Sequence, residues 1–129
     1  MTIIAGSVIF AALMLIITKM PMAIAMKNMS GAYDNKQPRL QAAKLEGFGK
    51  RAMSAHENSI EAFPLFAAGV LMALYAQASV SMIENLCLAF VAARIAYVVC
   101  YWLDWDKVRS LVWGVGFVSS LWLMCLALP

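Results

Sequence analysis

The sequence predicts an all-α integral membrane protein, and three observations support this prediction. Hydrophobic residues make up 64% of the chain, whereas soluble domains contain about 45–50%. Charged residues make up only 13% and the mean hydropathy is +0.78, so a soluble chain of 129 residues could not bury this much apolar surface. Four apolar segments are long enough to cross a hydrocarbon core of about 30 Å. We therefore expect one domain over residues 1–129, folded as a four-transmembrane-helix bundle.

The first membrane helix is expected from Thr2 to about Lys27. Its apolar run ends before Lys19 and Pro21. About 25 helical residues rise roughly 37 Å at 1.5 Å per residue, so the end near Lys27 should project into water. Lys19 should extend its ammonium group to the headgroups, and Pro21 should kink the helix.

The second membrane helix follows a polar segment from Asn28 to Gly49 that is rich in turn residues. We expect the chain to become helical from about Gln41 and to run without a break into the second span, as far as about Gln77. Pro64 lies inside this span, where we expect a kink or a lost hydrogen bond.

The last two membrane helices are joined by short connections. We expect the third from about Ser81 to Trp102 and the fourth from Val108 to about Leu128. Basic residues gather around the first and third connections, and the second connection and both termini have none. The distribution of positive charge therefore predicts that the first and third connections are cytoplasmic and that both termini lie on the other side.

Two polar stripes are predicted near the cytoplasmic end of the second and third helices. A helix turns about 100° per residue, so residues three, four or seven apart share a face. His56 lies more than 100° from the first stripe and should make a different contact. The stripe on the second helix contains Arg51, Ser54, Asn58 and Glu61, and the stripe on the third contains Arg94, Tyr97 and Tyr101.

Glu61 and Arg94 are expected to form an ion pair between the two stripes. One interpretation is a structural clasp between helices. The stripes hold more donors than a clasp requires, and Arg109 adds another arginine at the start of the fourth helix. Arginine binds carboxylates through paired hydrogen bonds, so the set also fits an anionic ligand with several carboxylates that enters from the cytoplasm.

Several other functions find no support in the sequence. It contains no Gly-rich phosphate loop and no basic stripe for nucleic acid. The single histidine, His56, has no cysteine near it, and the three cysteines have no CxxC spacing, so we expect neither a metal site nor a disulfide framework. Four spans without an inverted repeat also make a transporter a weak alternative.

The segment from Arg51 to Pro64, RAMSAHENSIEAFP, resembles the MAPEG family, the small membrane proteins of eicosanoid and glutathione metabolism. The chain resembles a bacterial-type member of this family. The family pattern on this helix is an arginine, an asparagine four residues later and a glutamate three residues after that, often followed by a proline. RIAYVVCY, residues 94–101, resembles the arginine and tyrosines that line the glutathione site of the family. This chain departs from the pattern at Ser54, where the family has the arginine.

The resemblance implies a homotrimer of left-handed four-helix bundles in the bacterial inner membrane. It also implies that glutathione, as co-substrate, binds between neighbouring subunits near the cytoplasmic face. The roles implied for the polar residues follow from the groups on glutathione. Arg51 and Arg94 would hold the carboxylates, Glu61 would bind the α-amino group and Asn58 would bind a polar group of the peptide. Tyr97 and Tyr101 would close the pocket. Arg109 or, as the second choice, Arg94 would stabilise the thiolate.

The function implied by the resemblance is a glutathione-dependent transferase or peroxidase. Its second substrate would be a lipophilic electrophile or a lipid hydroperoxide that arrives from the surrounding membrane lipids. The alternative is a non-enzymatic structural or accessory subunit of a membrane protein complex, which Ser54 favours because it replaces the family arginine.

Overall fold

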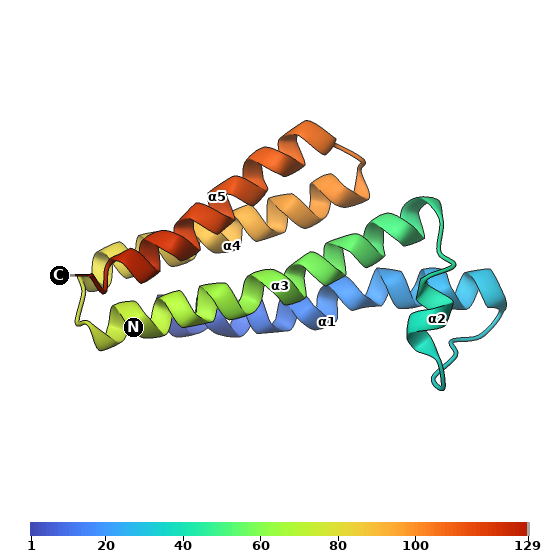
Figure 1. The fold of residues 1–129 in the computed structure, drawn as a ribbon, viewed down its shortest axis with the longest axis horizontal. Helices are drawn as coiled ribbons and strands as arrows, with labels where there is room; N and C mark the ends of the chain where they lie inside the picture. The colour runs from blue at the N-terminus through green and yellow to red at the C-terminus, as the bar shows by residue number, and fades with distance from the viewer. Residues whose placement is uncertain (129) are drawn as a thin grey trace.

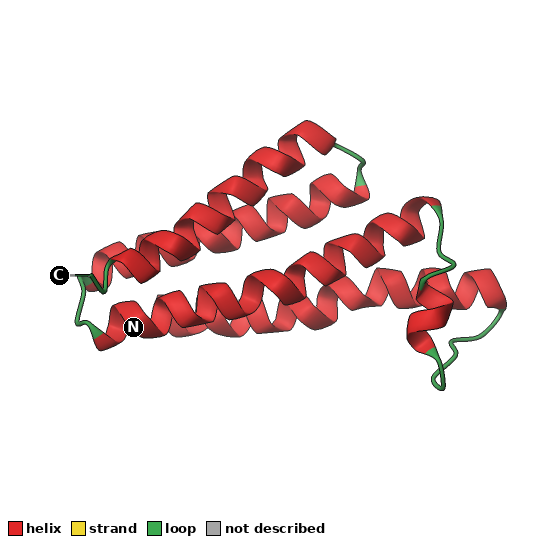
Figure 2. Ribbon diagram, viewed as in Figure 1, coloured by secondary structure: helices red, strands yellow, loops and turns green. Residues whose placement is uncertain are grey.

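The computed structural model describes residues 1–128, which form helices joined by loops and turns (Figure 1, Figure 2). No strand occurs among these residues. Four of the helices are long and apolar enough to cross a membrane, so the predicted four-span all-α architecture is confirmed. The elements are α1 (Thr2–Ser30), α2 (Pro38–Ala42), α3 (Gly47–Tyr75), α4 (Val80–Trp102) and α5 (Asp106–Cys125).

The start of the second span differs from the prediction. The helix that begins near Gln41 does not continue into the span, because α2 is a separate short helix and α3 begins at Gly47. The buried side chain of Gln41 accepts a hydrogen bond from the backbone N–H of Asp34 at 2.9 Å and donates to the carbonyls of Ala32 and Met26 at 2.8 and 3.3 Å. These bonds fold α2 back onto the end of α1, and Gly47 then turns the chain at a positive φ of 52°.

The other predicted boundaries lie within a few residues of the observed ones. Neither proline ends its helix, since α1 continues through Pro21 and α3 continues through Pro64. Both termini lie at one end of the bundle, and α2 and the α4–α5 turn lie at the other (Figure 1). We call the latter the α2 end.

The bundle consists of two helical hairpins, α1 with α3 and α4 with α5 (Figure 1). Helices α3 and α4 each contact the three other spanning helices. In the core, the rings of Phe66 on α3 and Phe90 on α4 stack with their centroids 3.9 Å apart. Stacked aromatic side chains contribute beyond the area they bury, so this contact helps to fix the hairpins together below the polar stripes.

Gly69 marks the closest approach of α3 and α5. A Cβ atom at this position would lie 2.8 Å from the backbone oxygen of Ser120 and 3.0 Å from Cβ of Leu123. Only a residue without a side chain permits this distance between two helices, as is common in membrane bundles.

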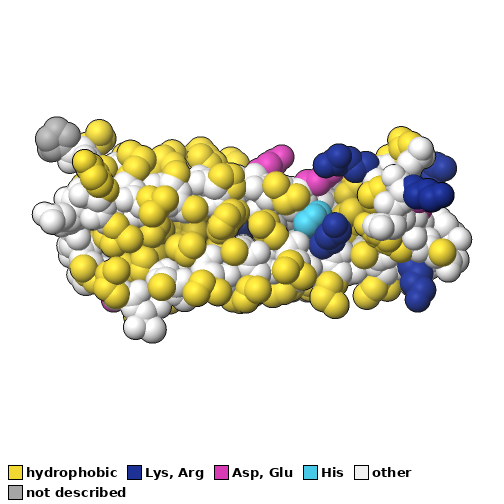
Figure 3. All heavy atoms as spheres, turned by 90° about the horizontal axis from the view of Figure 1, so that it is seen from below, with side chains coloured by type: hydrophobic (Ala, Val, Ile, Leu, Met, Phe, Trp, Pro, Cys, Tyr) yellow, Lys and Arg dark blue, Asp and Glu magenta, His cyan; other side chains and the backbone are white. Residues whose placement is uncertain are grey.

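The surface of the bundle is divided along its length. Hydrophobic side chains cover most of the face shown in Figure 3, and lysine and arginine side chains gather toward the α2 end. The apolar part includes isoleucines of α1 that are exposed in the single chain, such as Ile9 at 61% and Ile16 at 64%. Side chains that face lipid are typically apolar, because the acyl chains of a bilayer solvate them and they need not be buried inside the bundle.

Candidate functional site

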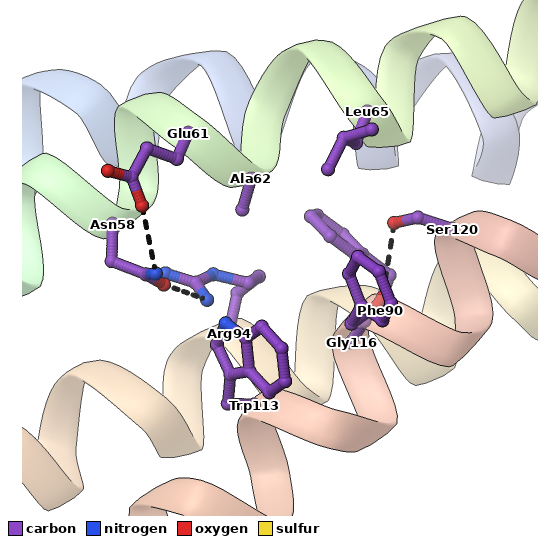
Figure 4. A pocket seen from close by; sticks show the side chains of 10 residues that line it. Asn58, Glu61, Ala62, Leu65, Phe90, Arg94, Trp113, Gly116 and Ser120 are labelled. Carbon is purple, nitrogen blue, oxygen red and sulfur yellow. Dashed lines mark hydrogen bonds between the residues drawn. The ribbon is translucent and has the colours of Figure 1, made fainter.

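A cleft of about 120 Å³ lies between α3, α4 and α5, on the face that carries the predicted stripes (Figure 4). The cleft has a polar wall around Arg94 at one end and an apolar wall that includes Leu65 and Phe90 at the other end. Its lining includes Asn58, Glu61, Arg94, Trp113, Phe117 and Ser120.

Arg94 anchors the polar wall. Only 6% of this residue is exposed. Its Nη1 donates to Oδ1 of Asn58 at 2.8 Å, and its Nη2 donates to Oγ of Ser59 at 3.3 Å. The guanidinium carbon also lies 4.4 Å from the ring centroid of Tyr97, within the range of a cation–π interaction. Arg94 therefore links α4 to α3 through neutral partners and remains a buried positive charge.

The predicted Glu61–Arg94 ion pair is not present. Asn58 lies between the two side chains and donates from Nδ2 to Oε2 of Glu61 at 3.4 Å (Figure 4). Glu61 is exposed, so it keeps its hydration, whereas burial against Arg94 would carry a desolvation cost. The glutamate thus presents a carboxylate at the edge of the cleft with capacity to accept further hydrogen bonds.

A series of contacts between aromatic and cationic groups continues from Arg94 toward the α2 end. The ring of Tyr97 meets the ring of Tyr101 edge to face, with centroids 5.3 Å apart. The guanidinium carbon of Arg109, from the first turns of α5, lies 4.3 Å from the centroid of Tyr101. Six of the seven predicted site residues are therefore linked by direct contacts, in the order Glu61, Asn58, Arg94, Tyr97, Tyr101 and Arg109.

Arg51 is the predicted site residue that lies apart from this series. Its Nη1 is 4.0 Å from Oδ2 of Asp104 in the α4–α5 turn, where Asp104 has a positive φ of 63°. Its Nε is buried and has no hydrogen-bond partner among residues 1–128. A buried donor without a partner has a strong tendency to bind an acceptor, so Arg51 retains binding capacity near the α2 end without lining the cleft.

His56 makes a separate contact, as predicted from its position on α3. Its Nδ1 lies 3.1 Å from Oγ1 of Thr18 on α1. The threonine hydroxyl already donates its hydrogen to the carbonyl of Met14 at 2.7 Å, so Nδ1 of His56 is the donor in this pair. The histidine therefore joins α3 to α1, on the side of α3 away from the cleft.

Some residues at the cleft were not predicted from the sequence. Ser59 does not line the cleft but accepts a hydrogen bond from Arg94. It could have been found, because it directly follows Asn58 on the same helix. Trp113 lines the cleft beside Arg94 (Figure 4). No polar spacing on α5 signals this role, because the other α5 residues in the lining are Gly116, Phe117 and Ser120.

No cluster of three or more metal-ligating side chains occurs in the described part of the chain. The titratable groups near the cleft are instead the isolated carboxylate of Glu61, the two arginines and the two phenols. Such a set offers hydrogen bonds and positive charge to an anion or a thiolate.

Comparison with known proteins gives one match. The model of the MAPEG family matches residues 3–129, essentially the whole chain. No curated protein matches, and no solved structure matches.

Proposed function

The chain belongs to the MAPEG family, and from this we propose that it is a glutathione-dependent transferase or peroxidase that acts on lipophilic electrophiles or lipid hydroperoxides. It is an integral membrane protein with four spanning helices. The observation that carries the proposal is the uninterrupted contact series from Glu61 to Arg109 beside a cleft with an apolar wall. The series presents one carboxylate and two guanidinium groups, and the apolar wall can accept a substrate from the bilayer.

The groups on glutathione complement this series. Glutathione carries two carboxylates, one α-amino group and one thiol. Glu61 is exposed and would accept hydrogen bonds from the α-amino group, and Asn58 beside it would bind a polar group of the peptide. Arg94 uses two of its five N–H groups on Asn58 and Ser59, so others remain for a carboxylate. Arg51, which has an unpartnered Nε, would bind the second carboxylate.

The chemical step requires the thiolate of glutathione. A free thiol titrates near about 8.5, so it is mostly protonated at neutral pH. A neighbouring guanidinium favours the anion, which is the nucleophile. We assign this role to Arg109 and, as the second choice, to Arg94. Tyr97 and Tyr101 would close the pocket between the two arginines.

Two reactions are available to that thiolate. With an electrophile, sulfur forms a bond to carbon and the leaving group departs with its electron pair. With a hydroperoxide, sulfur attacks the terminal oxygen and the O–O bond breaks, which gives an alcohol and a sulfenic acid of glutathione. A second glutathione then reduces the sulfenic acid, and the products are glutathione disulfide and water.

We propose that the protein assembles as a homotrimer in the bacterial inner membrane, with the α2 end and both charged connections in the cytoplasm and the termini on the opposite side. The positive charge at the α2 end supports this orientation. Glutathione would bind between neighbouring subunits and enter from the cytoplasm.

A second candidate is an accessory subunit without catalytic activity. Ser54 stands where the family pattern has an arginine, and Arg94 is bound by Asn58 and Ser59 as a structural clasp would be. In this case the contact series would hold the helices together and would bind no ligand.

Glutathione binding separates the two candidates. We expect saturable binding to the protein in mild detergent near neutral pH, measured by calorimetry, and at least about tenfold weaker binding to Glu61→Gln because the charged partner of the α-amino group is lost. Glu57→Gln is the matched control, since Glu57 is exposed on the same helix and does not line the cleft. Absence of binding to the well-folded native protein would favour the accessory subunit.

The role of Arg109 has a spectroscopic test. We expect Arg109→Ala to abolish the ultraviolet absorbance of bound glutathione thiolate at neutral pH. The affinity for glutathione should change by less than about threefold, which corresponds to a small change in the free energy of binding. Arg109→Lys should retain part of the absorbance, because a positive charge remains near the sulfur. Full absorbance in Arg109→Ala would assign thiolate stabilisation to Arg94 instead.

A further inference from the structure

A second recess lies on the other side of α3, between α1, α2 and α3, and has a volume of about 580 Å³. It shares no lining residue with the cleft described above. Figure 3 shows the only histidine of the chain on this side, beside lysine and arginine side chains at the edge of the hydrophobic surface. The basic residues in its lining are Lys19 from α1, Arg39 from α2, and Lys50 and His56 from α3.

The charge in this recess is unbalanced. Lys19, Arg39 and Lys50 are exposed and carry three positive charges, and Glu57 is the one carboxylate in the lining. Within residues 1–128, no carboxylate lies within 4.0 Å of any of the three cationic groups. Like charges held on one site repel each other, and an anion that binds among them relieves this repulsion.

The walls of the recess are held in place by buried and partly buried hydrogen bonds. The Thr18–His56 contact joins α1 to α3 at the level of Lys19. The amide of Gln41 fixes α2 against the end of α1, which places Arg39 at the opposite side. A binding site whose groups are already positioned loses less entropy when the ligand binds.

The recess also has an apolar side that continues toward the middle of the bundle. Met22, Met53 and Ile60 lie in its lining, and Ile60 is 50% exposed. Toward the middle of the bundle, the same helix faces present Ile16, which is three residues before Lys19 on α1 and 64% exposed, and Leu71, which is eleven residues after Ile60 on α3 and 68% exposed. A soluble anion makes no use of this surface, whereas acyl chains attached to an anionic headgroup can pack along it.

We propose that this recess binds the phosphate group of an anionic membrane phospholipid, with the acyl chains lying along α1 and α3. Three cations and an apolar surface meet here at the level where Lys19 leaves the spanning part of α1. Basic recesses between membrane helices at the charged face of a membrane bind headgroups in this way. The proposal is independent of the glutathione site, because it uses other residues.

Native mass spectrometry of the purified protein tests the proposal. Phosphatidylglycerol and phosphatidylcholine are added to the detergent-solubilised protein in equal amounts, and retention of each lipid is compared. We expect preferential retention of phosphatidylglycerol. In the double variant Arg39→Gln with Lys50→Gln we expect this preference to fall about twenty-fivefold, since each cation near an anionic headgroup contributes about fivefold.

The matched control is the double variant Lys36→Gln with Lys44→Gln. Both lysines are exposed in the same polar segment and lie outside the recess, so the loss of net charge is identical and the preference should remain. Equal retention of the two lipids by the native protein would overturn the proposal, as would an equal loss of preference in both double variants. Displacement of phosphatidylglycerol by millimolar inorganic phosphate would assign the recess to a soluble anion and would also overturn it.

Discussion

Replacing Arg94 by alanine is expected to weaken glutathione binding at least about a hundredfold while the proposed homotrimer survives in detergent. The variant removes the buried positive charge of the cleft, together with the N–H groups that Asn58 and Ser59 leave free to bind a carboxylate of glutathione. Hydrogen bonds to charged groups contribute about 1.5–3 kcal/mol each, and about 1.4 kcal/mol corresponds to a tenfold change in affinity. Calorimetry with glutathione and size-exclusion chromatography in detergent give the two readouts.

Arg94→Lys is the control for this prediction. It retains the charge but cannot contact Asn58 and Ser59 through one planar group, so we expect an affinity between those of the native protein and Arg94→Ala. If Arg94→Ala loses both the oligomer and glutathione binding, Arg94 acts as a clasp and the proposal that it binds a carboxylate fails. Unchanged binding in Arg94→Ala would remove it from the site altogether.

Replacing Gly69 by valine is expected to destabilise the bundle by about 3 kcal/mol, at the upper end of the usual range for overpacking. The new Cβ would lie 2.8 Å from the backbone oxygen of Ser120. A backbone atom cannot move aside as a side chain can, so α5 must shift away from α3. Because Ser120 also lines the cleft, the shift should alter the cleft as well. Reversible unfolding in mixed detergents measures the loss of stability.

Gly114→Val is the matched control. It introduces the same side chain into a membrane helix, and no other part of the structure lies within 4 Å of a Cβ at Gly114. We expect a change below about 1 kcal/mol there, from helix propensity alone. A similar loss of stability in both variants would show that the close approach at Gly69 is unimportant.

The four spans could be predicted from the sequence because each depends on local properties, namely apolar length and the polar residues that interrupt it. The break before α3 could not. It depends on the amide of Gln41, which bonds to backbone groups as far back as Met26, and such contacts between distant residues leave no periodic signal. Pro21 and Pro64 lie inside helices that continue past them, as expected from the sequence.

The candidate site was predicted in its composition more than in its geometry. Helical spacing alone placed Asn58 with Glu61 and Arg94 with Tyr97, and both pairs are in contact. Spacing within one helix gives no information on the angle between two helices, so it could not show that Asn58 separates Glu61 from Arg94. The α5 wall escaped prediction because Gly116 and Ser120 are small and Trp113 has several common roles in membrane proteins.

The tryptophans also have a practical consequence. All four lie between residues 102 and 122, so one helical hairpin contains every indole of the protein and α1 to α3 contain none. Trp113 lines the cleft, and Trp122 is 53% exposed on the apolar surface. Tryptophan fluorescence would therefore report on this hairpin alone. A nitroaromatic compound that enters the cleft should quench the emission of Trp113, while brominated acyl chains should quench that of Trp122, so the two routes of approach are optically distinguishable without an added label.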